Sequence, residues 1–185
     1  MASVHGGCLL ATRQRQADTY VMTDDDLCDL VTQLGVTLKA REWRLAVAES
    51  CTGGWVAKVL TDIAGSSAWF ERGFVTYSNA AKQELLDVRA ATLDEFGAVS
   101  EQTAREMAAG ALVHSQADVV LAITGIAGPD GGTPDKPVGL VWIAWARRSG
   151  AVRVARYHFS GDRAAVRRQA VIAALQGVLC VFNDA

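Results

Sequence analysis

Two adjacent residues of the chain, Ser50 and Cys51, could each act as a nucleophile. They lie in the stretch Ala-Glu-Ser-Cys-Thr-Gly-Gly at 48–54, between a short apolar segment and a segment with helical spacing. A strand that turns tightly into a helix places this stretch at the strand's carboxyl end, where α/β sheets usually bind ligands. The N–H groups of such a turn can hold an anion or an oxyanion. The alternative is that Ser50 or Thr52 only caps the helix.

Lys82 is the candidate for the base that such a nucleophile requires. The chain has only four lysines, and Lys82 follows Tyr77 and Ser78 closely. These two residues end a segment rich in aromatic and β-branched residues that we interpret as a strand. A lysine beside a site at a sheet edge can lose its proton through desolvation and act as a general base. The alternative is an ordinary surface lysine on a short helix.

A glycine-rich loop follows a second apolar segment. Asp118 to Thr124 has the composition of a buried central strand, and Gly-Ile-Ala-Gly-Pro-Asp-Gly-Gly follows it at 125–132. The loop is neither a P-loop nor a dinucleotide fingerprint, because no Gly-Lys-Ser/Thr and no helix follow. Its position at a strand's carboxyl end favours a binding site. A simple connection is the alternative.

Several arginines lie near the start of the last predicted helix, in Gly-Asp-Arg-Ala-Ala-Val-Arg-Arg at 161–168. Arg163 and Arg167 could bind a phosphate through bidentate contacts, together with the free N–H groups of the helix start. A capped helix with a solvated basic face would have the same pattern.

Composition and charge exclude some functions. The chain has 185 residues, a net charge of −2 and half of its residues apolar, as in a globular domain without a basic surface for nucleic acid. No apolar run reaches the length of a membrane span, and no secretory signal is present. Its four scattered cysteines form no Cys-x-x-Cys pair. We therefore expect a cytoplasmic protein with free thiols and no membrane or nucleic-acid partner.

The apolar periodicity alternates between helices and strands, which predicts an α/β fold. We expect residues 1–22 to form a flexible N-terminal tail and 23–185 a single domain. Its architecture should be a three-layer α/β/α sandwich with a mixed, mostly parallel sheet, because 138–147 and 151–159 flank Ser-Gly as in a hairpin. We expect helices capped by Thr23 and Ser100 and helices that start at Asn79 and Asp162, in addition to the helix at 55–63.

Taken in order, the motifs resemble one family. Ala-Glu-Ser-Cys-Thr-Gly-Gly, Tyr-Ser-Asn followed by Lys82, Gly-Ile-Ala-Gly-Pro-Asp-Gly-Gly, Lys-Pro-Val-Gly and Gly-Asp-Arg-x-x-Val-Arg are similar to the C-terminal domain family of the competence/damage-inducible protein CinA. The resemblance covers roughly residues 23 to 182. Stand-alone members of the family are nicotinamide mononucleotide amidohydrolases. The resemblance implies a serine–lysine amidase in pyridine nucleotide salvage, with no cofactor, no metal and a tendency to form homo-oligomers.

The resemblance also implies roles for individual residues. Ser50 would attack the substrate carboxamide, Lys82 would accept its proton, and Tyr77 would relay the proton or hold the lysine. The amides of Cys51 and Thr52 would stabilise the oxyanion. The substrate would be bound by Thr124, Gly125, Gly128, Gly131, Arg163 and Arg167.

Three alternatives remain open at this point. Arg168, Arg72 or an arginine of a neighbouring subunit could bind the phosphate instead. Cys51 could be the nucleophile, since a thiol at a helix start has a depressed pKa, although cysteine amidases normally pair with histidine. The chain could also be a non-catalytic module that binds nucleotides for regulation.

Overall fold

A five-stranded sheet with the strand order β2-β1-β3-β4-β5 forms the centre of the computed structural model, which describes residues 23–150 and 152–181. The central strand β1 (Leu45–Glu49) is parallel to β2 (Phe70–Val75) and to β3 (Val119–Gly125). The strand β4 (Leu140–Arg147) is antiparallel to β3 and to β5 (Arg153–His158). The predicted mixed sheet and C-terminal hairpin are confirmed, with two parallel and two antiparallel pairings.

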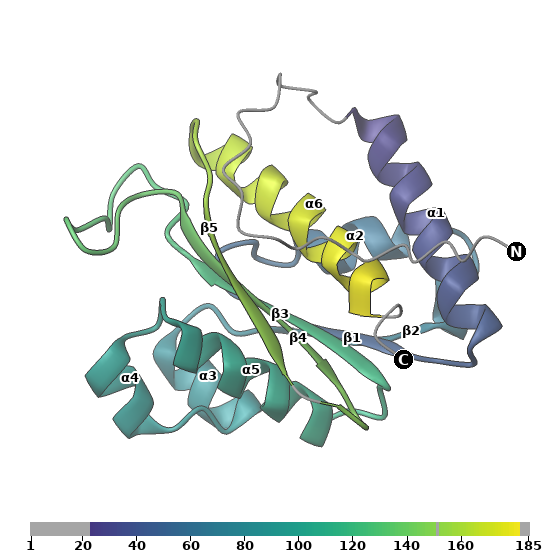
Figure 1. The fold of residues 1–185 in the computed structure, drawn as a ribbon, viewed down its shortest axis with the longest axis horizontal. Helices are drawn as coiled ribbons and strands as arrows, with labels where there is room; N and C mark the ends of the chain where they lie inside the picture. The colour runs from purple at the N-terminus through teal and green to yellow at the C-terminus, as the bar shows by residue number, and fades with distance from the viewer. Residues whose placement is uncertain (1–22, 151, 182–185) are drawn as a thin grey trace, which may run out of the picture.

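Helices cover both faces of the sheet and complete the predicted three layers (Figure 1). One face carries α1 (Asp24–Ala40), α2 (Trp55–Thr61) and α6 (Arg163–Val181). The other carries α3 (Asn79–Leu86), α4 (Ala90–Phe96) and α5 (Glu101–Val113). A short 3₁₀ helix, Ser66–Ala68, precedes β2. The predicted tail, residues 1–22, lies outside the described residues.

The capping predictions largely hold. The Thr23 side chain accepts a hydrogen bond from the Asp26 amide in a capping box, and Ser100 caps α5 through the Thr103 amide. The helix α3 begins at Asn79, as predicted, and the Ser78 side chain caps it through the Ala81 amide. We predicted no helix at α4, whose N-cap residue makes no capping hydrogen bond with its side chain. A tertiary contact supports it instead, because Glu106 of α5 accepts a 2.7 Å hydrogen bond from its Thr92.

The two faces of the sheet differ in side-chain size. In β1, the larger residues Leu45 and Val47 face the core under α1, α2 and α6, whereas Ala46 and Ala48 face α5. The alanines let α5 pack close to the sheet. The helix α3 packs in turn on α5, so closely that a Cβ at Gly110 would lie 1.9 Å from the Leu86 carbonyl oxygen. This close packing fixes the position of α3 relative to α5.

The parallel pairing brings three chain segments to one edge of the sheet. Because β1 lies between β2 and β3, the residues that follow these three strands end side by side. They are Ser50, Thr76 and the loop that begins at Ile126. The candidate catalytic residues come from these segments, which agrees with the rule that α/β sheets bind ligands at the carboxyl ends of their strands.

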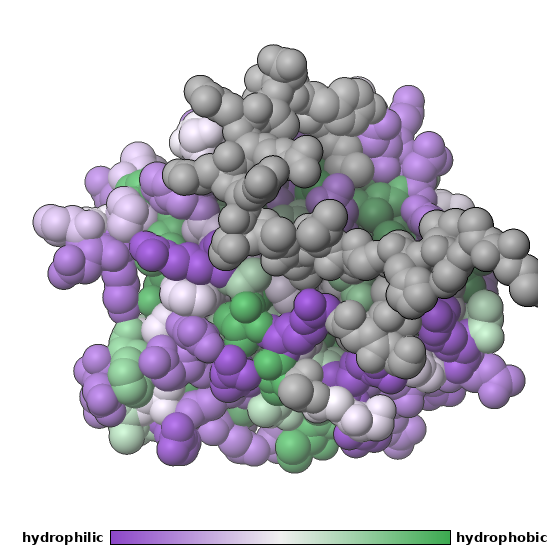
Figure 2. All heavy atoms as spheres, in the orientation of Figure 1, coloured by the Kyte–Doolittle hydropathy of each residue, from purple (hydrophilic) through white to green (hydrophobic). Residues whose placement is uncertain are grey.

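On the face shown in Figure 2, hydrophobic residues lie scattered between hydrophilic ones and form no large continuous patch among the coloured residues. The exposed large hydrophobic residues of the described chain come from separate elements, among them Val36 of α1, Val75 of β2 and Val113 of α5. None of the helices in the described residues is both long and apolar enough to cross a bilayer.

Candidate active site

The Ser50 side chain lies at the end of β1, in a turn that leads into α2. The Ser50 amide donates a 3.0 Å hydrogen bond to Ile123 of β3, and the Ser50 carbonyl accepts one of 3.0 Å from the Gly53 amide. Cys51 and Thr52 therefore form the centre of a tight turn. Their own amides make no backbone hydrogen bond within the described residues. These two N–H groups remain candidates for an oxyanion site.

Glu49, which the sequence analysis missed, caps α2. Its fully buried carboxylate accepts hydrogen bonds of 2.9, 3.1 and 2.8 Å from the amides of Gly54, Val56 and Ala57. The alternative that Ser50 or Thr52 caps this helix is therefore wrong. The N–H groups at the start of α2 are occupied, so only the turn itself can bind an anion. A charged residue at the end of an otherwise apolar strand is the signal that could have revealed this role.

Lys82 reaches the Ser50 side chain from α3. Its Nζ donates hydrogen bonds of 2.9 Å to Ser50 Oγ and 2.7 Å to the Thr76 carbonyl oxygen, and the residue is only 1% exposed. Burial lowers the pKa of Lys82 from 10.5 to about 8, against a smaller opposing effect of Cys51. The surface-lysine alternative is wrong. A buried amine with this pKa is partly neutral near pH 7 and can accept a proton.

Burial shifts the pKa of Cys51 in the direction opposite to that of Lys82, because it favours the neutral thiol. Its side chain is buried, and burial raises the pKa of the thiol from 9.0 to about 11, with weaker lowering effects from its own amide, Lys82 and Arg167. The thiol is therefore protonated at neutral pH, when a nucleophilic cysteine would have to be a thiolate.

A cavity of about 280 Å³ opens beside the Ser50–Lys82 pair. Thr124 borders it, with its hydroxyl donating a 2.7 Å hydrogen bond to the Ala98 carbonyl. The glycine loop comes close to the hairpin here, since a Cβ at Gly125 would lie 2.7 Å from Val141 Cγ2. The predicted site residues that line the cavity are Ser50, Cys51, Tyr77, Lys82, Thr124, Gly125, Gly128, Gly131 and Arg163. Thr52 and Arg167 do not line it.

Tyr77 contacts an arginine rather than the lysine. Arg163 donates 2.9 Å hydrogen bonds to Tyr77 Oη and to the Gly128 carbonyl, and so joins α6 to the segment after β2 and to the glycine loop. Tyr77 Oη makes no hydrogen bond with Lys82 or Ser50. Tyr77 is 62% exposed, and its ring borders the mouth of the cavity.

The remaining candidate arginines lie away from the cavity. Arg167 donates a 2.7 Å hydrogen bond to the Thr52 carbonyl, behind the nucleophile turn. Arg72 binds Glu71 and the His114 carbonyl on the exposed side of β2. Arg168 pairs with Asp24 at 2.6 Å. Arg163 is therefore the one member of the predicted set that borders the cavity.

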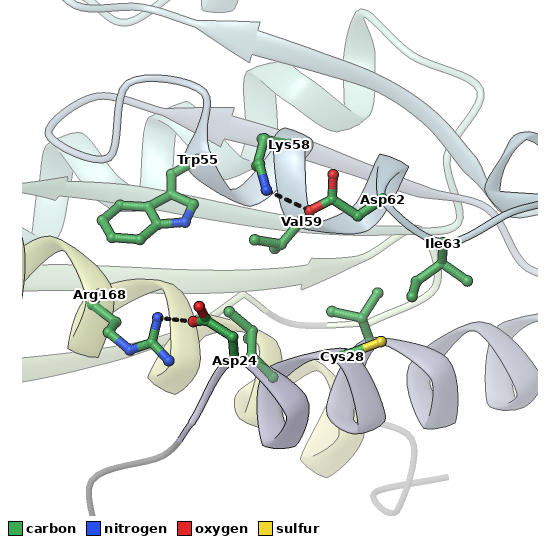
Figure 3. Close-up of a pocket in the computed structure, with 10 residues that line it drawn as sticks. Asp24, Cys28, Trp55, Lys58, Val59, Asp62, Ile63 and Arg168 are labelled. Atoms are coloured by element: carbon green, nitrogen blue, oxygen red, sulfur yellow. Dashed lines mark hydrogen bonds and ion pairs between the residues drawn. The ribbon is translucent and has the colours of Figure 1, made fainter.

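A larger cavity of about 450 Å³ lies between α1, α2 and α6 (Figure 3). Its charged residues pair with one another, Lys58 with Asp62 and Arg168 with Asp24, both at 2.6 Å. The rest of its lining is largely apolar. The cavity holds no nucleophile with an adjacent base, so the smaller cavity at Ser50 is the candidate active site.

The fold and the site define a three-layer α/β/α protein with a buried serine–lysine pair at the carboxyl ends of its parallel strands. The family model named CinA C-terminal domain matches residues 28–182. The chain belongs to this family.

Similar proteins occur in several bacteria. Over 155 residues, the chain is 61% identical to the nicotinamide-nucleotide amidohydrolase PncC of Escherichia coli K12, with coverage of 84% of this chain and 94% of that protein. It is 56% identical over 161 residues to the protein of the same name from Enterobacter agglomerans, covering 87% and 98%. The crystal structure of the competence/damage inducible protein CihA from Agrobacterium tumefaciens is 45% identical and superposes with a TM-score of 0.82, covering 83% of this chain and 94% of that one.

Proposed function

We propose that the protein is an amidohydrolase that converts nicotinamide mononucleotide to nicotinate mononucleotide and ammonia through an acyl-enzyme on Ser50. The observation that carries the proposal is the 2.9 Å hydrogen bond between Ser50 Oγ and the buried Lys82 amine. The amidohydrolase relatives at 56% and 61% identity support the choice of substrate.

Lys82 moves the proton in each step. As Ser50 Oγ bonds to the carboxamide carbon, its proton passes to the neutral Lys82 amine. The C–N bond then breaks while Lys82 returns the proton to the leaving nitrogen, and ammonia departs. In the second half, Lys82 takes a proton from water as the water oxygen bonds to the ester carbon. The bond between that carbon and Ser50 Oγ then breaks, Lys82 returns the proton to Oγ, and the acid product leaves as its carboxylate. A positioned base of this kind contributes about 10²–10⁴-fold to the rate.

The burial of Lys82 determines how much active base is present. With a pKa of about 8 instead of 10.5, the neutral fraction at pH 7 increases from roughly 3 × 10⁻⁴ to roughly 0.1. The Thr76 carbonyl, 2.7 Å away, holds the amine in place. The oxyanion that develops during attack would lie against the amides of Cys51 and Thr52.

Arg163 is our candidate for the substrate phosphate. It borders the cavity, and its two bonds to Tyr77 and Gly128 leave guanidinium N–H groups for an anion. Tyr77 would then hold this arginine and border the pyridine ring instead of relaying a proton. Thr124 and the glycines at 125, 128 and 131 would complete the binding surface. The cavity volume of about 280 Å³ lies near the lower end of the roughly 300–1,000 Å³ that small-molecule pockets have.

Cys51 is a weaker candidate for the nucleophile. Its thiol has a pKa of about 11, and no histidine lines the cavity. The described histidines that could serve are occupied elsewhere, His114 with Asp87 and His158 with the Val138 carbonyl.

We also propose, on the family resemblance alone, a role in pyridine nucleotide salvage as a cytoplasmic homo-oligomer.

The test is the release of ammonia and nicotinate mononucleotide from nicotinamide mononucleotide, in the presence of a chelator. We expect both products in equal amounts. If the mononucleotide raises the melting temperature of the protein without ammonia release, the pocket binds nucleotides without chemistry, and the non-catalytic alternative is correct.

A further inference from the structure

Arg167 binds the turn that follows Ser50 but does not line the cavity. Its Nη2 donates a 2.7 Å hydrogen bond to the Thr52 carbonyl oxygen, and its guanidinium lies 5.2 Å from the ring centroid of Trp55 at the start of α2. A Cβ at Gly53 would lie 3.6 Å from Nη2. Arg163, one helical turn earlier on α6, borders the cavity instead. The two arginines of one helix therefore face different parts of the site.

The hydrogen bond from Arg167 completes the restraints on one peptide plane of the turn. The carbonyl of the Thr52–Gly53 peptide accepts from Arg167 and, at 3.2 Å, from the Trp55 amide. The N–H of the same peptide donates to the Ser50 carbonyl at 3.0 Å. With this plane held at both ends, the preceding amides of Cys51 and Thr52 have little freedom to rotate.

The contact between Arg167 and the turn leaves buried polar atoms unpaired, which good packing would avoid. Arg167 Nε and Thr52 Oγ1 are both buried without a hydrogen-bond partner in the described part of the chain. Burying an unpaired polar atom is unfavourable, so an apolar side chain at this position would avoid the desolvation free energy. The positive charge of Arg167 also acts on the turn, since it is one of the charges that lower the pKa of Cys51 against the effect of burial.

We propose that Arg167 is a positioning residue that fixes the Cys51 and Thr52 amides as the oxyanion site and places a positive charge behind them. It does not bind the substrate phosphate. The proposal rests on the proposed function, since it requires acyl transfer to Ser50. It assigns two of the three arginines of α6 to separate tasks, substrate binding for Arg163 and oxyanion stabilisation for Arg167.

The test compares Arg167→Ala and Arg167→Lys with Arg168→Ala, the neighbouring arginine that pairs with Asp24 outside the cavity. Loss of oxyanion stabilisation lowers kcat by about 10²–10³-fold. We expect this loss for Arg167→Ala, with KM for nicotinamide mononucleotide almost unchanged, partial activity for Arg167→Lys, and partial rescue of Arg167→Ala by added guanidinium. Arg168→Ala should behave like the wild type. An increase in KM at constant kcat, or no effect, would overturn the proposal.

A second substrate separates this proposal from the proposed function. p-Nitrophenyl acetate carries no phosphate, and its attack by Ser50 needs the same oxyanion site. We expect Arg167→Ala to acylate much more slowly than the wild type. If the wild type releases no ammonia from the mononucleotide, the proposed function fails, while this acylation rate still tests Arg167. Equal rates for wild type and Arg167→Ala would refute the positioning role, and Arg167→Lys provides the comparison if the alanine variant does not fold.

Discussion

Replacing Lys82 by methionine should abolish activity and change how the stability of the protein depends on pH. The Lys82 side chain is 1% exposed, and its pKa is lowered from 10.5 to about 8 because burial disfavours the charged amine. Methionine has a similar length and carries no charge, so it removes the desolvation cost while filling most of the same space.

The magnitude follows from the pKa difference of about 2.5, which is 10.5 minus 8 and corresponds to about 3 kcal/mol. Below pH 8 the lysine is protonated in both the folded and the unfolded chain, and the folded wild type carries the whole cost. Between pH 8 and pH 10.5 the unfolded chain binds more protons than the folded one, so the stability of the wild type increases with pH. The lost hydrogen bonds to Ser50 and Thr76 cost the variant about 1 kcal/mol each at every pH.

The assay is urea unfolding of wild type and Lys82→Met from pH 6.5 to pH 10.5, with Lys58→Met as the control. Lys58 is a lysine with a 68% exposed side chain that pairs with Asp62 on α2. We expect the free energy of unfolding of the wild type to gain about 3 kcal/mol relative to Lys82→Met over this range, and to remain parallel to that of Lys58→Met. Parallel curves for wild type and Lys82→Met would refute the argument that Lys82 is desolvated.

Other predictions concern the rate and the support of the site. Because Lys82 must be neutral and its pKa is about 8, kcat/KM should increase about tenfold from pH 7 to pH 9, and a flat profile would count against a lysine base. Cys51→Ala should retain most of kcat, since the protonated thiol takes no part; its inactivity beside an active Ser50→Ala would reverse the assignment. Glu49→Gln should lower the free energy of unfolding by about 1–3 kcal/mol, measured in urea, and unchanged stability would contradict the capping role. Arg163→Met should raise KM for the mononucleotide about 10–100-fold, and unchanged KM would exclude it as the phosphate ligand.

The candidate pair Ser50 and Lys82 could be selected from the sequence because both follow strand-like segments, although only the family resemblance favoured this pair over a helix cap and a surface lysine. Ser50 and Lys82 each follow a strand-like segment closely, and neighbouring parallel strands end at the same edge of a sheet. The prediction needed no knowledge of strand order. The hydrogen bond between them follows once β1 and β2 are paired.

Contacts between distant segments could not be predicted in the same way. Arg163 and Arg167 share one face of a helix, and periodicity alone gives them equal access to a ligand. Only the packing of α6 against the turn separates them, through a hydrogen bond that links Arg167 to Thr52. Glu49 was missed for a related reason: a charge at the end of an apolar strand signals a buried partner, but the partners are backbone amides of α2, which the sequence does not identify.

The most direct test of the central claim is ammonia release from nicotinamide mononucleotide by wild type, Ser50→Ala and Lys82→Ala, with Lys58→Ala as the matched control. The account predicts turnover by wild type and Lys58→Ala only. It also predicts that the inactive Ser50→Ala variant still binds the mononucleotide, seen as an increase in melting temperature. Turnover by Ser50→Ala at the rate of the wild type would contradict the serine–lysine mechanism.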